Sequence, residues 1–220
     1  MMSGNLQWSK RVSNKKYDFS LLDEGTKLIE DERIINWSEI FENPNDRVLE
    51  IGCGNGHFLT QKASDTPQLN FIGIDIKHER VTKCIEKAVK NNLKNIKFFV
   101  DEGLHFIKNY FPDGSFSTVY LLFPDPWPKR KHHKNRLLLK ELFIDALYEK
   151  LKDNAVFIYV TDHEEYFNSS YERFKTDKRF ELQNETDNEQ YSVSIFGKKW
   201  KEEGRNFYSF TLKKKIGIFY

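Results

Sequence analysis

The chain has 220 residues, which is enough for one domain with a hydrophobic core and short for two. Its 35 Lys and Arg against 33 Asp and Glu give a net charge of +2, so binding to a polyanion would have to depend on a local patch. The sequence has no apolar run near the ~18 residues of a membrane helix and no apolar segment of a secretory signal at its start. Two cysteines are too few for a disulfide framework, and we expect a cytoplasmic protein.

Residues 1–46 are predicted to form an irregular arm with one helix around Leu21–Phe41, and residues 47–220 a single globular domain. Five short apolar segments in that domain are rich in β-branched and aromatic residues, which is typical of buried parallel strands. These segments are Arg47–Ile51, Asn70–Ile76, Asn95–Val100, Thr118–Phe123 and Ala155–Val160.

Helical patterns separate several of these strands. Apolar residues recur three and four positions apart over Val81–Val89 and Leu139–Leu147, and a weaker helix is expected near Glu164–Phe174. Alternating strands and helices predict an α/β, Rossmann-like fold with a mostly parallel sheet. Tyr191–Phe196 and Asn206–Lys213 are expected to add an antiparallel pair at the C-terminal edge.

The first strand runs into a glycine loop, Gly52-Cys53-Gly54-Asn55-Gly56. Glycines at the carboxyl end of a strand let the backbone pass close to a ligand. The G-x-G-x-G spacing differs from the G-x-G-x-x-G of dinucleotide sites, and Glu50 beside it would repel a pyrophosphate. A cationic ligand suits this loop better, and the methionine end of S-adenosylmethionine carries both an ammonium and a sulfonium.

Acids also end the next two strands. Asp75 lies 23 positions after Gly52, near the ~20 expected for an acid that binds ribose hydroxyls. Asp101 and Glu102 follow the third strand, where an acid could accept from an adenine amino group. A structural turn with solvated acids is the alternative, but three acids at three successive strand ends favour a nucleoside site.

A second motif follows the fourth strand, Leu122-Phe123-Pro124-Asp125-Pro126-Trp127-Pro128-Lys129. Two prolines restrict the backbone around Asp125, and rigid placement suits a catalytic group. Trp127 offers a face that could stack on a base, and Lys129–Arg136 (KRKHHKNR) forms a basic run suited to phosphates. The alternatives are a plain turn, a packed core tryptophan and a solvated charged face.

The segments EIGCGNG, GID, FPDPWPK with its basic tail, and TDHEEY together resemble the bacterial tRNA (guanine-N7)-methyltransferase family. The resemblance extends roughly from Arg47 to Tyr166, and the DPWPK element is its most specific part. It implies that S-adenosylmethionine is the cofactor, that tRNA is the partner, and that a guanine of the variable loop is methylated at nitrogen 7. A monomer or a homodimer is expected.

The resemblance also implies roles for particular residues. It makes Asp125 the catalytic residue. At the second cofactor position Asp75 stands where the family usually has the longer Glu. At the third cofactor position either Asp101 or Glu102 could be the ligand. The family's late Thr-x-x-Glu element aligns its Thr with Ser194 and its Glu with Gly197, which lacks the carboxylate; Glu202 or Glu203 lies close enough to replace it. The expected cofactor ligands are Glu50, Gly52, Asp75, Glu102 and Asp125, and the expected substrate contacts are Lys129, Asp162 and Ser194.

Three other functions share some of these sequence features. A methyltransferase acting on exocyclic amino groups would place Pro-Pro-aromatic after the fourth-strand acid, whereas Trp127 follows a single Pro126. An inactive RNA-binding relative is disfavoured by the intact glycine loop, and an NAD-dependent dehydrogenase by the glycine spacing. No metal is expected, because no Cys or acid lies at ligand spacing from His132 and His133.

Overall fold

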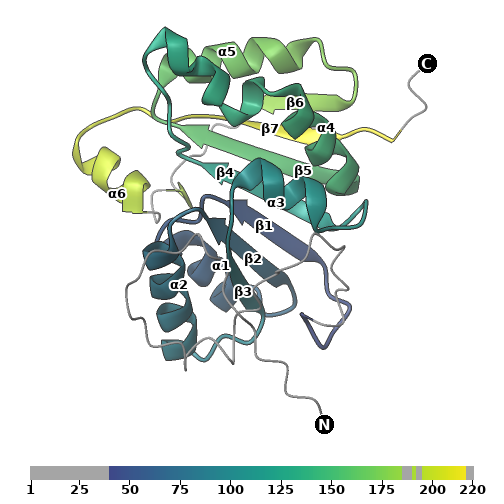
Figure 1. The fold of residues 1–220 in the computed structure, drawn as a ribbon, viewed down its shortest axis with the longest axis vertical. Coiled ribbons are helices and arrows are strands. Elements are labelled where there is room, and N and C mark those ends of the chain that lie inside the picture. The colour runs from purple at the N-terminus through teal and green to yellow at the C-terminus, as the bar shows by residue number, and fades with distance from the viewer. Residues whose placement is uncertain (1–39, 185–189, 192–194, 217–220) are drawn as a thin grey trace, which may run out of the picture.

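The computed structural model describes residues 40–184, 190–191 and 195–216. Its centre is a seven-stranded sheet in the order β3-β2-β1-β4-β5-β7-β6 (Figure 1). Neighbours among β1 to β5 pair in parallel, and β7 pairs antiparallel with both β5 and β6. The predicted α/β fold with an antiparallel edge is therefore confirmed.

The strands are β1 (Arg47–Ile51), β2 (Asn70–Asp75), β3 (Ile96–Val100), β4 (Phe116–Leu122), β5 (Leu151–Thr161), β6 (Phe180–Asn184) and β7 (Tyr208–Lys214). The helices are α1 (His57–Asp65), α2 (His78–Lys90), α3 (Gly103–Asn109), α4 (Glu141–Lys150), α5 (Glu164–Lys175) and α6 (Ile195–Glu202). Two 3-10 segments, η3 (Arg130–Asn135) and η4 (Leu137–Leu139), lie between β4 and α4.

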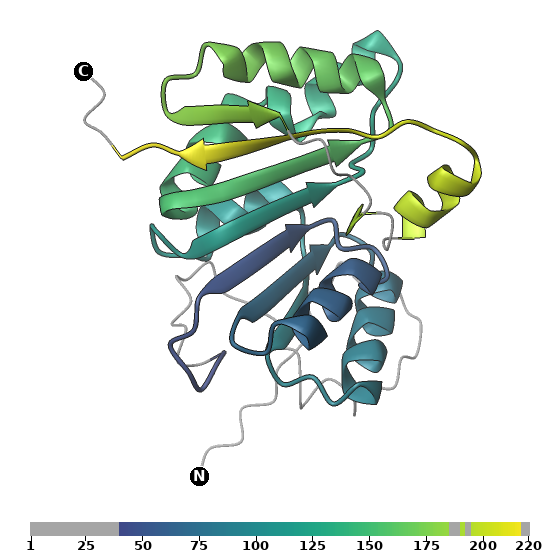
Figure 2. The same ribbon diagram turned by 180° about the vertical axis from the view of Figure 1, so that it is seen from behind.

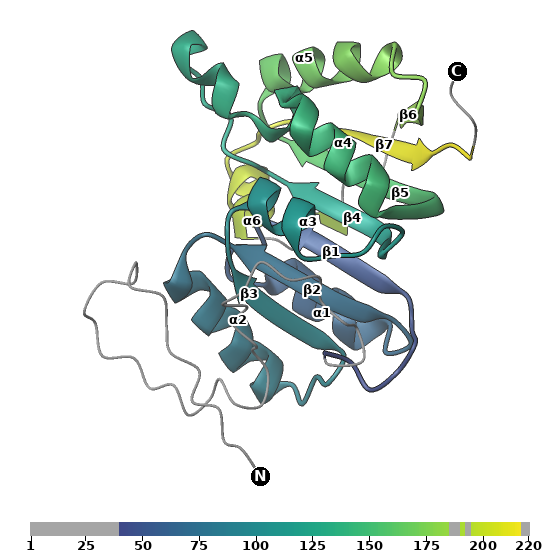
Figure 3. The same cartoon turned by 45° about the vertical axis from the view of Figure 1, so that its right-hand side comes forward.

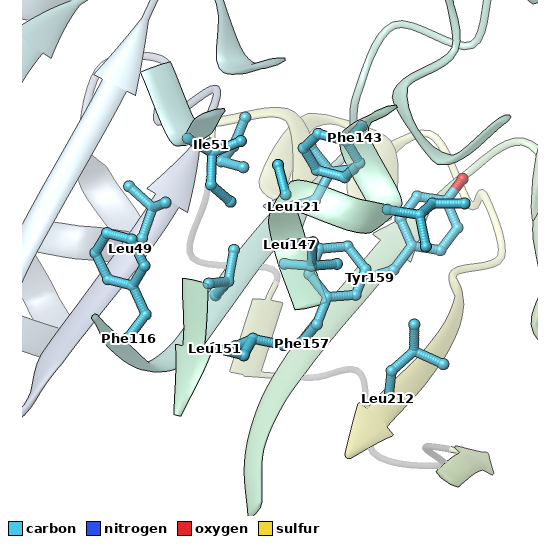
Figure 4. Packing of buried hydrophobic residues seen from close by; sticks show 14 of the residues in the cluster. Leu49, Ile51, Phe116, Leu121, Phe143, Leu147, Leu151, Phe157, Tyr159 and Leu212 are labelled. Atoms are coloured by element: carbon cyan, nitrogen blue, oxygen red, sulfur yellow. The ribbon is translucent and has the colours of Figure 1, made fainter. Parts of the chain in front are cut away.

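Helices cover both faces of the sheet, so apolar side chains of the strands are buried on each side. Along β1, Leu49 and Ile51 point into the larger core cluster and Val48 into a second one, as the two-residue period of a strand requires. The larger cluster packs against α3, α4 and α5 (Figures 3 and 4), and the second against α1 and α2 (Figure 2). This arrangement explains why the strands read as almost continuously apolar.

The prediction of a strand over Tyr191–Phe196 is wrong. Tyr191 lies in a 3-10 turn and buries its ring near Phe58, and the helix α6 begins at Ile195. Both edges of β7 are already paired, with β5 on one side and β6 on the other, so no edge is left for another strand. The antiparallel partner is instead the short segment Phe180–Asn184, whose two apolar residues gave a weak pattern.

Most of the N-terminal arm, including nearly all of the helix expected over Leu21–Phe41, lies outside the described residues. Phe41, where the expected helix would end, is buried in the larger core cluster. None of the helices in the described part of the chain combines the length and the apolar composition of a membrane-spanning segment.

Candidate cofactor and substrate site

Two adjoining cavities lie where the parallel strands end, which is the edge at which open α/β sheets bind ligands. Figure 2 shows the arrowheads of these strands directed toward the side that carries α6. The larger cavity measures about 300 Å³ and the smaller about 90 Å³. Both are lined by Gly52, Arg80, Leu122 and Phe123, so they share the glycine loop and the end of β4 as walls.

The glycine loop has two kinds of glycine. Gly52, Gly54 and Gly56 all adopt a left-handed backbone, with φ of 78°, 57° and 70°, and the Gly52 amide donates to the Ile74 carbonyl at 2.8 Å. A Cβ on Gly52 or Gly54 would meet nothing within 4 Å, whereas one on Gly56 would lie 2.8 Å from Cys84 Sγ. The first two glycines therefore leave open space beside the cavities, and the third allows α2 to pack closely.

Glu50 is the buried acid of the smaller cavity. Its side chain is 2% exposed, and its Oε2 atom has no hydrogen-bond partner among the described residues. Burial raises the pKa of this carboxyl from 4.5 to about 8, and the nearby Asp75 carboxylate adds to the effect. An unpaired buried carboxyl beside an open glycine loop fits the cationic end of S-adenosylmethionine, because an ammonium would supply the missing partner.

Asp75 is held rigidly at the end of β2. Its Oδ2 atom accepts hydrogen bonds from the Gly54 amide at 3.0 Å and from Arg80 Nη1 at 3.3 Å, and its Oδ1 atom accepts from the Lys77 amide at 2.9 Å. The carboxylate lines the larger cavity while it orders the glycine loop. Ribose hydroxyls at this position would share the carboxylate with Arg80.

Asp101 and Glu102 both line the larger cavity, at the end of β3. Asp101 Oδ2 lies 2.9 Å from His105 Nδ1, and its Oδ1 accepts from the Glu102 amide at 2.7 Å. Glu102 Oε2 accepts from the His105 amide at 3.0 Å and so caps the N-terminus of α3. Both Asp101 oxygens are thus engaged within the chain, and so is one oxygen of Glu102.

The loop after β4 brings Asp125 and Trp127 to the same cavity. Asp125 is exposed, and Trp127 is 38% exposed. The centroids of the Trp127 and His132 rings are 5.9 Å apart. A packed core position for Trp127, one of the alternatives, is therefore wrong. Trp127 and Phe123 have positive φ values of 46° and 49°, a strained backbone for residues other than glycine that is found mainly where the surrounding structure enforces it.

The basic run after this loop divides into exposed and buried members. Lys129, Arg130 and Lys131 are exposed, as phosphate-binding residues would be. Arg136 is not: its side chain is completely buried, and its guanidinium bonds to Glu165 and to the Pro126 carbonyl. The expectation that the whole of Lys129–Arg136 forms a phosphate patch is wrong at Arg136.

Two of the three predicted substrate contacts, Lys129 and Asp162, lie outside the cavities. Lys129 is exposed at the start of η3, and Asp162, after β5, accepts a hydrogen bond from Arg205 Nη1 at 2.6 Å. Neither lines either cavity. Ser194 lies outside the described residues, and Gly197 is buried in α6. Glu203 pairs with Arg205, whose guanidinium is thereby shared with Asp162.

Sequence reasoning missed three arginines that organise the site, namely Arg80, Arg136 and Arg205. Arg80 carried a detectable signal, because an arginine in the first turn of a helix opposes the helix dipole and so calls for a nearby acid. The other two carried none: Arg136 was hidden in a basic run, and Arg205 follows an element that was predicted wrongly.

The chain is similar in sequence to known methyltransferases. A protein-family model described as "Putative methyltransferase" matches residues 44–210. The tRNA (guanine-N(7)-)-methyltransferase of Colwellia psychrerythraea is 41% identical over 133 residues, which is 60% of this chain and 54% of the relative. The protein of the same name from Streptococcus mutans is 36% identical over 139 residues, 63% of this chain and 65% of the relative. The chain thus spans about half to two thirds of the length of these curated relatives.

Solved structures show the same fold at low identity. The 16S rRNA methyltransferase KamB superimposes with a TM-score of 0.58 at 14% identity, over 79% of this chain and 89% of that one. A phosphoethanolamine N-methyltransferase of Haemonchus contortus, solved in complex with S-adenosyl-L-methionine, gives a TM-score of 0.51 at 16% identity, over 78% of this chain and 49% of that one. These likenesses concern the fold alone.

Proposed function

The chain belongs to the family of putative methyltransferases whose model matches residues 44–210, and we propose that it transfers a methyl group from S-adenosylmethionine to nitrogen 7 of a guanine in tRNA. The observation that carries this proposal is the larger cavity, where Asp75 and Glu102 share one space with Asp125. The names of the curated relatives support the choice of tRNA and of guanine nitrogen 7. The resemblance of the DPWPK element suggests the variable loop as the place of the target base.

Three acids would each bind a different part of the cofactor. Glu50 would pair with its ammonium, Asp75 would accept from its ribose hydroxyls, and Glu102 would accept from its adenine amino group. When bound, S-adenosylmethionine supplies a methyl group on a positively charged sulfur. The chain's own task is then to align an acceptor with that methyl group and to exclude competing nucleophiles.

Asp125 is proposed as the catalytic residue. Guanine nitrogen 7 is a lone pair on the major-groove edge and carries no proton, so the chain needs no general base before transfer. The guanine becomes cationic as its new N–C bond forms, because the bond from the methyl carbon to sulfur breaks at the same time and S-adenosylhomocysteine leaves as a neutral thioether. A fixed carboxylate at Asp125 would favour that developing charge, and it would also accept hydrogen bonds from the guanine N–H groups.

The exposed part of the basic run would bind the tRNA backbone. Lys129, Arg130, Lys131 and Lys134 extend from the cavity loop along η3, and all four are exposed. Trp127 lies between this run and the cavity, so its ring could stack on a base that has been turned out of its helix. Affinity would then depend on phosphate neutralisation and selectivity on the cavity.

The test is to incubate the protein with labelled S-adenosylmethionine and unmodified tRNA, then to digest the tRNA and identify the labelled nucleoside. We expect 7-methylguanosine. Asp125→Ala should lower kcat by about 100-fold or more. Another methylated nucleoside would contradict the proposed target. Cofactor binding without any label would favour an inactive RNA-binding relative.

A further inference from the structure

Arg136 makes three hydrogen bonds from a fully buried guanidinium. Its Nε donates to the Pro126 carbonyl at 2.8 Å, and its Nη1 and Nη2 donate to the two carboxylate oxygens of Glu165 at 3.0 and 2.5 Å. Its Cζ also lies 4.7 Å from the centre of the Tyr166 ring. Only a guanidinium can reach these acceptors together, because a lysine offers one compact ammonium instead of a planar fork.

The two segments joined by Arg136 are the loops that carry the proposed substrate acids. Pro126 directly follows Asp125 in the loop after β4. Glu165 lies in the first turn of α5, three residues after Asp162, which follows β5. Since β4 and β5 are parallel neighbours, their carboxyl ends meet at one edge of the sheet, and Arg136 fixes the separation of the two loops there.

The β4 loop needs such a tether. Pro124, Pro126 and Pro128 have no amide hydrogen, so this stretch has few donors with which to anchor itself. Phe123 and Trp127, on either side of Asp125, both have the left-handed backbone described above. Strained backbone of this kind persists only where other contacts impose it, and the Pro126 carbonyl is held by Arg136.

The partner carboxylate is held in its ionised state by the same contact. Hydrogen bonding from Arg136 lowers the pKa of Glu165, although the Glu165 side chain is 55% exposed. A buried guanidinium without this partner would carry an uncompensated charge, which is costly. The position is therefore specific for arginine, in contrast to the exposed lysines of the same run.

We propose that Arg136 is a positioning residue that holds the Asp125 loop against the start of α5, so that Asp125 faces the methyl acceptor at the cavity. This inference rests on the proposed methyl transfer to guanine. Arg136 touches neither cavity, and it acts on the reaction through the loop.

The decisive experiment compares Arg136→Gln in the wild-type and Asp125→Ala backgrounds. We expect Arg136→Gln to lower kcat by about 100-fold, the scale of a 1 Å misplacement, with the KM for tRNA nearly unchanged. In the Asp125→Ala background the same change should lower kcat by no more than about twofold, because residues that act through one another are not additive. Equal losses in both backgrounds would overturn the proposal.

A matched control separates positioning from general stability. Arg179 also bridges elements through carboxylates, with Asp145 at 2.6 Å and Glu141 at 2.9 Å, but it lies away from the cavities. Arg179→Gln should lower the melting temperature and leave kcat unchanged. If Arg136→Gln does not fold, Glu165→Gln serves as the second variant, with a smaller loss of kcat and the same dependence on Asp125. Unchanged kcat in both variants would contradict the positioning role.

Hydrogen exchange tests the loop without relying on catalysis. The Phe123 amide donates to the Val160 carbonyl at 2.7 Å, where the loop leaves the sheet. This amide should exchange faster in Arg136→Gln and at the wild-type rate in Arg179→Gln. If wild-type protein formed no 7-methylguanosine, the proposed function would fail, and this exchange would still decide whether Arg136 holds the loop. Equal exchange rates of the Phe123 amide in Arg136→Gln and Arg179→Gln would show that Arg136 does not hold the loop.

Discussion

Asp75 Oδ2 accepts a hydrogen bond from the Gly54 amide at 3.0 Å. This bond joins the acid that ends β2 to the glycine loop that follows β1, across two parallel strands that pair directly. This interaction therefore couples the shape of the loop to the position of the proposed ribose ligand. A substitution at Asp75 or at Gly54 should therefore disturb both the glycine loop and the proposed ribose ligand, and so weaken cofactor binding.

Asp75→Asn is expected to weaken the binding of S-adenosylmethionine by about tenfold or more. The amide keeps an acceptor oxygen but loses the charge that Arg80 and the Gly54 amide now meet, and a hydrogen bond to a charged group contributes about 1.5–3 kcal/mol. Calorimetric titration measures the affinity. Asp65→Asn, an exposed site on α1, is the matched control and should bind as the wild type does. Equal affinities for both variants would contradict the role of Asp75.

The geometry of the glycine loop predicts that two alanine substitutions affect different properties, Gly56→Ala mainly stability and Gly54→Ala mainly cofactor binding. Gly56→Ala places a Cβ 2.8 Å from the buried Cys84 Sγ, and such overpacking destabilises by about 1–3 kcal/mol. Gly54→Ala meets no atom, so its cost to stability is the left-handed strain alone, about 1–2 kcal/mol. Its methyl group projects into open space beside the cavity and should weaken cofactor binding. Urea unfolding and titration measure the two effects, and a Gly54→Ala protein less stable than Gly56→Ala would be inconsistent with this geometry.

Glu50 predicts a pH dependence of stability in the ligand-free protein. Its pKa is raised from 4.5 to about 8 in the folded state by burial, so the folded protein retains a proton that the unfolded chain has lost. The stability contribution is complete below pH 4.5 and is lost as the pH rises toward about 8. Glu50→Gln cannot ionise and should lack this dependence. Parallel urea unfolding of the two proteins across this window is the measurement, and identical profiles would argue against a protonated Glu50.

The same group should couple cofactor binding to proton release. A cationic ligand favours the ionised carboxylate, so binding near pH 7 should expel a proton from wild-type Glu50. Calorimetry in buffers of different ionisation enthalpy counts that proton. Glu50→Gln should release about one proton fewer than the wild type. No difference between the two proteins would mean that the ammonium does not meet this carboxyl.

The exposed basic run predicts how the proposed binding of tRNA should depend on salt. Each phosphate contact contributes about 0.7–0.9 to the slope of log affinity against log salt. Lys129→Gln should weaken binding for all tRNAs and reduce this slope by about one contact. Lys90→Gln, exposed at the end of α2, removes the same charge elsewhere and should leave the slope unchanged. If Lys129→Gln leaves the slope unchanged, Lys129 does not contact a tRNA phosphate.

Local patterns were sufficient to predict the parallel part of the sheet and the position of three acids at its carboxyl edge. The strands β1 to β5 are largely buried and read as apolar runs, and Glu50, Asp75 and Glu102 lie at or next to the ends of β1, β2 and β3. The antiparallel edge of the sheet was harder to predict. β6 has only two apolar residues, and Tyr191 is buried by contact with Phe58 rather than by pairing in the sheet.

Contacts between distant segments could not be predicted from spacing. Arg136 and Glu165 are 29 positions apart, and nothing in a run of eight basic and polar residues marks the last arginine as buried. Similarly, Asp162 is engaged by Arg205, 43 positions away. Burial of such charges depends on which loops meet in the folded chain, which is a tertiary property.

The proposed function requires guanine nitrogen 7 to be the methyl acceptor. The most direct measurement compares two tRNA transcripts, one made with guanosine and one with 7-deazaguanosine, as substrates for methyl transfer from labelled S-adenosylmethionine. The deaza base has carbon in place of nitrogen 7 and so lacks the lone pair that would form the new bond. Label in the guanosine transcript alone is the predicted result. Equal labelling of both transcripts would contradict the claim and place the methyl group on another atom.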